Sequence, residues 1–143
     1  MSAHKRVLVV DDETKILFVV RHALSRLGEH CQVETARNGR QAIEIARATP
    51  FDLVVTDLRM PELDGIALTE ALRELDPNPQ VIWMTAYHCC AHEADMKRLG
   101  VCCCLDKPIE IAEIRRVVGG TLWPGLKDPY GTRKETRCRP TNT

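Results

Sequence analysis

The 143-residue sequence lacks a net charge, a long apolar run and a recognisable secretory leader. Its 20 Lys and Arg residues balance its 20 Asp and Glu residues, so no overall electrostatic preference for nucleic acid or for an acidic membrane is expected. No apolar stretch approaches the ~20 residues that a membrane-spanning helix needs. Because seven cysteines occur without a leader, we expect free thiols and a cytoplasmic location.

Several functional motifs are also missing. The sequence contains no P-loop, no helix-turn-helix pattern and no basic recognition helix, so direct binding of nucleic acid is not expected. No pair of cysteines has the CxxC spacing of a zinc knuckle. The chain also shows no low-complexity tract and no internal repeat other than the alternation described next.

Short apolar runs alternate with segments of helical periodicity. The runs predict strands at 6–10, 31–36, 52–56, 81–84 and 101–105, and the periodic segments predict helices at 13–27, 40–48, 64–75, 88–99 and 109–118. Such alternation favours a three-layer α/β fold, with a parallel sheet covered by helices on both faces. The periodicity fails from Gly119, so we expect a basic, flexible tail over residues 119–143, with Leu122 and Trp123 as candidates to pack back on the domain.

Polar residues follow four of the predicted strands. Asp11 and Asp12 follow the first, Asp57 the third, Thr85 the fourth and Lys107 the fifth. Ligands of open parallel sheets bind beyond these strand ends. Three carboxylates held close together need a cation or raised pKa values, and oxygen ligands with room for water suit Mg²⁺. A carboxylate can also attack phosphorus, so the pattern indicates a magnesium-assisted phosphoryl-transfer site.

A structural explanation exists for each of these residues taken singly. An Asp after a strand often only caps the next helix, and this is an equal alternative for Asp11 or Asp12 alone. Asp64 is predicted to be a turn or cap residue. A lone Thr or Lys at a strand end is usually plain surface. The joint pattern at four strand ends favours a site.

Four motifs, in this order, resemble those of response-regulator receiver domains. They are Val-Val-Asp-Asp-Glu13, Asp57-Leu-Arg-Met-Pro-Glu-Leu-Asp-Gly65, Met-Thr-Ala-Tyr87 and Lys107-Pro108-Ile109. The match spans roughly residues 4–118, and the amino acids of the last two motifs most resemble those in receivers of the nitrogen-regulation type. The resemblance implies a flavodoxin-like, five-stranded parallel sheet of order 2-1-3-4-5 with five helices.

The resemblance also implies a role for each acidic residue. Asp57 would accept a phosphoryl group from a sensor histidine kinase or a histidine phosphotransfer protein. Asp12 would bind Mg²⁺ directly and Asp11 through water, and the carbonyl of Arg59 would complete the protein ligands. The side chains of Arg59 and Tyr87 occupy positions that tune hydrolysis in this family. Such a domain is a self-modifying signalling protein rather than an enzyme.

The remaining implied roles concern the phosphoryl group and the switch. Thr85 and Lys107 would hold the phosphoryl oxygens, and Lys107-Pro108 would be a cis peptide. The family usually carries Tyr or Phe three residues before the lysine, where this chain has Cys104. Because a thiol makes few contacts, we expect the Thr85–Cys104 switch to be weakened or rerouted.

Cysteines are concentrated near this position. Cys89 and Cys90 open the fourth predicted helix, and Cys102, Cys103 and Cys104 fill the last strand, where alternation places Cys102 and Cys104 on one face. Together with His92, they raise the alternative of a thiolate–imidazole metal site or a redox pair. Buried cysteine that acts as a small apolar residue is the simpler explanation.

The main functional hypothesis is a phosphorylation switch that binds an unidentified output protein, with a homodimer as one option, through residues 88–118. Two alternatives share the chemistry: a phosphorelay intermediate or phosphate sink, and the receiver portion of a larger transcriptional regulator. A phosphatase acting on small molecules would need a lid insertion, which the loops lack. A flavin-binding domain would need a Ser/Thr/Gly-rich first loop, where this chain has acidic residues.

Overall fold

The computed structural model describes residues 4–86 and 89–125. Its strands are β1 (Lys5–Val10), β2 (Cys31–Ala36), β3 (Leu53–Asp57), β4 (Gln80–Thr85) and β5 (Cys103–Asp106). Its helices are α1 (Thr14–Ser25), α2 (Gly39–Ala48), α3 (Gly65–Leu72), α4 (Glu93–Leu99) and α5 (Ile111–Leu122), and a 3₁₀ turn, η1 (Cys89–His92), precedes α4.

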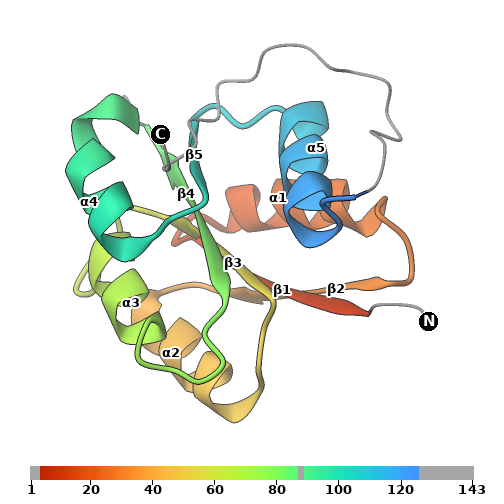
Figure 1. Cartoon of the computed structure of the whole chain (residues 1–143). Coiled ribbons are helices and arrows are strands. Elements are labelled where there is room, and N and C mark those ends of the chain that lie inside the picture. Colours follow the sequence, from red (N-terminus) through yellow and green to blue (C-terminus); the bar gives the residue numbers. More distant parts are fainter. Residues whose placement is uncertain (1–3, 87–88, 126–143) are drawn as a thin grey trace.

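The five strands form one parallel sheet in the order β2-β1-β3-β4-β5. Helices α1 and α5 cover one face, and α2, α3 and α4 cover the other (Figure 1). The predicted three-layer, flavodoxin-like fold is therefore confirmed. The order of the strands reverses between β1 and β3, and ligands of such folds bind at this point.

Alternating side chains of each strand feed two separate apolar cores. Leu8 and Val10 of β1 face α2 and α3, whereas Val7 and Val9 face α1 and α5. Every residue of β3 is buried, as expected of a central parallel strand. Because each fully buried aliphatic side chain stabilises the fold by about 1.5–3 kcal/mol, the sheet is a rigid support for the residues at its ends.

The first turn of α3 is fixed by two neighbouring residues. The Asp64 carboxylate accepts a hydrogen bond of 2.8 Å from the Ala67 N–H, which confirms the predicted cap. A side chain at Gly65 would overlap the carbonyl oxygen of Asp57 and the Cα of Leu58. Glycine at this position therefore lets α3 begin directly against the end of β3.

The predicted C-terminal end of the last helix is wrong. Helix α5 continues through Gly119 and Gly120 to Leu122, four residues beyond the predicted end. Leu122 is buried and Trp123 is partly buried against the α1–α5 core, as suggested from the sequence. Burial of these two side chains outweighs the cost of about 1 kcal/mol that each glycine adds to a helix. The rest of the predicted tail, from residue 126, lies outside the described residues.

The segment between β4 and β5 also differs from the prediction. The single predicted helix at 88–99 is divided into η1 and α4, and β5 begins at Cys103 rather than at residue 101. Val101 follows α4 and closes its last turn, because its N–H donates to the carbonyl of Met96. Within the described residues, no helix has both the length and the apolar character that a bilayer crossing requires.

Candidate functional site

The carboxyl ends of the central strands bring the predicted acidic residues together. Asp11 directly follows β1, and Asp57 is the last residue of β3. Asp11, Asp12 and Asp57 each place one carboxylate oxygen within 4.8 Å of the others. Asp11 and Asp57 are buried, whereas Asp12 is exposed at the mouth of the group. Asp11 does not cap α1; it accepts a hydrogen bond of 2.9 Å from the Glu13 N–H.

Lys107 lies between the two buried carboxylates. Its Nζ is 3.0 Å from Asp11 Oδ2 and 3.3 Å from Asp57 Oδ1. Glu13 Oε1, which the sequence analysis did not single out, is 4.0 Å away. The N–H of Lys107 donates to the carbonyl of Thr85 at 2.7 Å, and the Lys107–Pro108 peptide is cis. One ammonium is therefore shared by two carboxylates that have little access to water.

The pKa values of the site reflect this crowding. Burial raises the pKa of Asp11 to about 6, against hydrogen bonds from Glu13 and Lys107 that lower it. Burial also raises the pKa of Asp57, although Lys107 and the N–H of Arg59 favour its ionised form. For Lys107, burial acts against the charge, but its bonds to Asp11 and its attraction to Asp57 raise the pKa. The site thus holds more negative charge than its own cation balances, which suits an additional cation.

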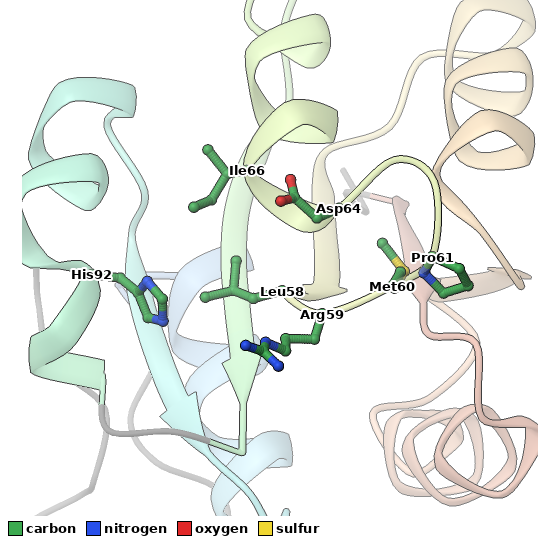
Figure 2. Close-up of a pocket in the computed structure, with 7 residues that line it drawn as sticks. All are labelled: Leu58, Arg59, Met60, Pro61, Asp64, Ile66 and His92. Carbon is green, nitrogen blue, oxygen red and sulfur yellow. The ribbon is translucent and has the colours of Figure 1, made fainter.

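Arg59 and Thr85 lie beside the carboxylates in different ways. The N–H of Arg59 bonds to the carboxylate of Asp57, and Thr85 is buried at the end of β4. The Arg59 side chain lines a neighbouring cleft of about 470 Å³ together with Leu58, Met60, Pro61, Asp64, Ile66 and His92. Figure 2 shows Arg59 on the side of His92, with Met60 and Pro61 at the other end. Tyr87 lies outside the described residues.

The cysteines do not assemble as the metal hypothesis required. Cys104 is fully buried and forms a hydrogen bond with Cys89, but His92 packs edge-on against Trp83, with 6.4 Å between ring centres. Cys102 joins the opposite core from Cys104, so the predicted shared face is wrong. Among the residues described, the one group of three candidate metal ligands consists of Asp11, Asp12 and Asp57.

The expectation of free thiols holds for part of the set. Among the cysteines whose side chains the structure describes, Cys31, Cys89, Cys102 and Cys104 are free. Cys103 is disulfide-bonded, so the expectation is wrong for that residue. Asp106, which hydrogen-bonds to Cys89, was missed in the sequence, although its place at a strand end next to Lys107 was a usable signal.

A parallel sheet that gathers three carboxylates and a lysine at its switch point defines a class of phosphoacceptor domains. The chain belongs to the response-regulator receiver family of two-component signalling, because the sequence model described as "Response regulator receiver domain" matches residues 7–119. The described fold agrees with solved members. The chemotaxis response regulator CheY4 of Vibrio cholerae superposes with a TM-score of 0.75 at 27% identity, over 82% of this chain and 98% of that one.

Two curated relatives differ in how much of them the chain spans. It is 34% identical over 115 residues to sporulation initiation phosphotransferase F of Bacillus subtilis, covering 80% of this chain and 91% of that protein. It is 35% identical over 130 residues to the transcriptional regulatory protein ZraR of Escherichia coli, covering 91% of this chain. The match covers only 28% of ZraR, so the activity of such a regulator as a whole does not carry over.

Proposed function

We propose that Asp57 accepts a phosphoryl group from the phosphohistidine of a sensor kinase or a phosphotransfer protein, in the cytoplasm and with Mg²⁺ bound. The observation that supports this most strongly is the convergence of Asp11, Asp12 and Asp57 within 4.8 Å, with Lys107 Nζ 3.3 Å from Asp57. The Asp11–Asp12 pair, Asp57 and Lys107 are far apart in the sequence, and the topology of the sheet brings them together.

The donor set fits magnesium. Carboxylate and carbonyl oxygens are hard ligands, and Mg²⁺ usually keeps several waters beside one or two carboxylates. In this proposal Asp12, Asp57 and the carbonyl of Arg59 are direct ligands, and Asp11 acts through water. The raised pKa of Asp11, about 6, supports the need for a further cation. When bound, Mg²⁺ would offset the charge of the phosphoryl oxygens.

The transfer itself needs little machinery from the protein. A carboxylate oxygen of Asp57 attacks phosphorus, an O–P bond forms, and the N–P bond breaks with its electron pair left on the imidazole nitrogen. The ammonium of Lys107 and the hydroxyl of Thr85 stabilise the phosphoryl oxygens. Attack of water on the acyl phosphate later restores the carboxylate, so the protein modifies itself and turns over no separate substrate.

Intact mass spectrometry after incubation with acetyl phosphate and Mg²⁺ tests this proposal. We expect one phosphoryl adduct that is stable in acid and labile in base, and none in Asp57→Asn. Asp52→Asn is the matched control, because Asp52 lies at the opposite end of β3 and accepts a bond of 2.8 Å from the Arg6 N–H. An adduct that persists in Asp57→Asn, or forms equally well with EDTA, would contradict the proposal.

A relay role is the second candidate, and coverage of 91% of a curated phosphotransferase supports it. A relay intermediate passes its phosphoryl group back to a histidine, whereas an output receiver binds its partner, here proposed to use residues 88–118. Transfer from the radiolabelled protein to a histidine phosphotransfer domain would favour the relay. Phosphorylation-dependent dimerisation with no such transfer would favour an output role.

A further inference from the structure

A second group of interacting side chains lies directly beside the proposed phosphoryl site. Asp106 ends β5, immediately before Lys107, and is paired in register with Thr85. Its Oδ1 accepts two hydrogen bonds from Cys89, one from the backbone N–H at 3.2 Å and one from the thiol at 3.1 Å. The first residue of η1 is therefore attached to the end of β5.

The thiol of Cys89 is a well-defined donor in this group. Cys89 is 1% exposed, and its neighbour Cys104 is completely buried. A hydrogen bond with Cys104, burial and the Asp106 carboxylate together raise the pKa of Cys89 far above its usual range. The thiol thus keeps its proton and donates a hydrogen bond to the Asp106 carboxylate.

The mobile aromatic side chain that receiver domains usually carry at the position of Cys104 is absent here, and the aromatic side chain beside it is fixed. Cys104 has no ring to move, and its register partner Trp83 is fully buried on the neighbouring strand. The indole N–H of Trp83 donates to Thr69 Oγ1 at 2.9 Å, which holds the ring in place. No ring at position 104 is therefore available to link the phosphoryl site to α4.

We propose that Asp106 and Cys89 are positioning residues that couple the phosphoryl site to η1 and α4. Only three residues separate Thr85 from Cys89, and the carbonyl of Thr85 is bound to the Lys107 N–H. A shift of Thr85 toward a phosphoryl oxygen therefore acts on Asp106, its register partner, and through Asp106 on Cys89. Contacts that differ between two states are what an allosteric coupling requires. This inference rests on the proposed phosphorylation of Asp57.

Amide NMR spectra of the whole chain, recorded with and without fluoroberyllate and Mg²⁺, test the coupling. Fluoroberyllate mimics a phosphoryl group on a carboxylate. The readout is the ratio of the shifts in α4, at Met96 and Leu99, to the shift at Leu58 beside the site. Because Asp106→Ala removes both hydrogen bonds, we expect the ratio to fall to roughly half or less. Cys89→Ala removes only one of the two bonds to Asp106, the one from the thiol, so we expect a smaller fall.

Two further variants serve as controls. Cys89→Ser retains a donor and should restore the wild-type ratio. Cys102→Ala removes a thiol that bonds to Gln80 instead, and it should leave the ratio unchanged.

The possible failures are distinguishable. Absence of any shift at Leu58 in the wild type would overturn the proposed function itself. Normal shifts at Leu58 with an undiminished α4 response in Asp106→Ala and Cys89→Ala would overturn the coupling alone. If Asp106→Ala does not fold, the comparison of Cys89→Ala with Cys89→Ser decides, and equal ratios in the two would overturn the coupling.

Discussion

The two ends of the sheet use the same kinds of charged residue in opposite ways. At the amino end, Arg6 Nη2 lies 2.8 Å from Glu34 Oε2, and the Arg6 N–H donates to Asp52 Oδ2 at 2.8 Å. Both side chains of the Arg6–Glu34 pair are about 40% exposed (39% and 41%). At the carboxyl end, Asp11 and Asp57 share Lys107, and the Asp11 side chain has no exposed surface.

The difference shows where the protein gives up stability. Exposed pairs of opposite charge contribute only about 0–1 kcal/mol, and they impose little strain. Carboxylates that are buried in their charged form destabilise the folded state, and burial is the main reason that the pKa values of Asp11 and Asp57 are raised. Perturbed groups of this kind concentrate at functional sites. The carboxyl end is therefore built for a ligand, and the amino end is ordinary surface.

The largest effect on stability is expected from removing the shared ammonium group of Lys107. In Lys107→Ala, the buried carboxylates Asp11 and Asp57 have no neutralising ammonium. We expect the free energy of unfolding in urea at pH 7.5, without Mg²⁺, to fall by about 3 kcal/mol. Saturating Mg²⁺ should restore part of it. A fall below about 1 kcal/mol would mean that the two ends of the sheet do not differ as described.

Replacing one of the buried carboxylates by a neutral group should instead raise the free energy of unfolding. The pKa of Asp11 rises from 3.8 to about 6 on folding, so the folded state binds this proton more readily than the unfolded state. The resulting penalty is absent below pH 4 and complete above pH 6 or so. We expect Asp11→Asn to stabilise the metal-free protein by about 2 kcal/mol at pH 7.5 and by almost nothing near pH 4. Destabilisation at pH 7.5, in urea titrations, would contradict this.

The affinity for Mg²⁺ should depend on the same proton. Since metal ligands must be deprotonated, calorimetric titration at pH 5 should give a dissociation constant roughly tenfold weaker than at pH 7.5. Asp12→Asn should weaken binding at both pH values and retain the ratio between them. Asp11→Asn should remove most of the pH dependence. An equal pH dependence in Asp11→Asn would assign the proton to another group.

The α/β class and the convergence of the acidic residues were predictable because both follow from local patterns, whereas the strand order was implied by the resemblance to receiver domains. Apolar runs that end in Asp11, Asp57, Thr85 and Lys107 mark buried strands, and parallel pairing brings their carboxyl ends to one edge. The cap at Asp64 is likewise a local signal, because its side chain bonds to a backbone N–H only three residues further along the chain.

The missed features depend on contacts between distant segments. Gly119 and Gly120 oppose a helix locally, and only the packing of Leu122 against the other core continues it. The bond between Asp106 and Cys89 depends on the 3₁₀ turn η1, which the helical periodicity of residues 88–99 did not separate from α4. The prediction that Cys102 and Cys104 share a face assumed that both residues lie in β5. The strand begins only at Cys103, after the end of α4, so the alternation does not apply to Cys102.

The smallest expected effect belongs to the amino end of the sheet. In Glu34→Gln, Arg6 loses an exposed partner but keeps its bond to Gln32, and its side chain stays partly exposed. We expect a loss of about 0.5 kcal/mol or less in urea unfolding, which should vanish in high salt because exposed pairs are screened. Adduct formation at Asp57 and Mg²⁺ affinity should stay unchanged. A loss as large as that of Lys107→Ala would contradict the comparison. It would show that the difference in burial between the two ends of the sheet does not set the energetic cost of losing a charge there.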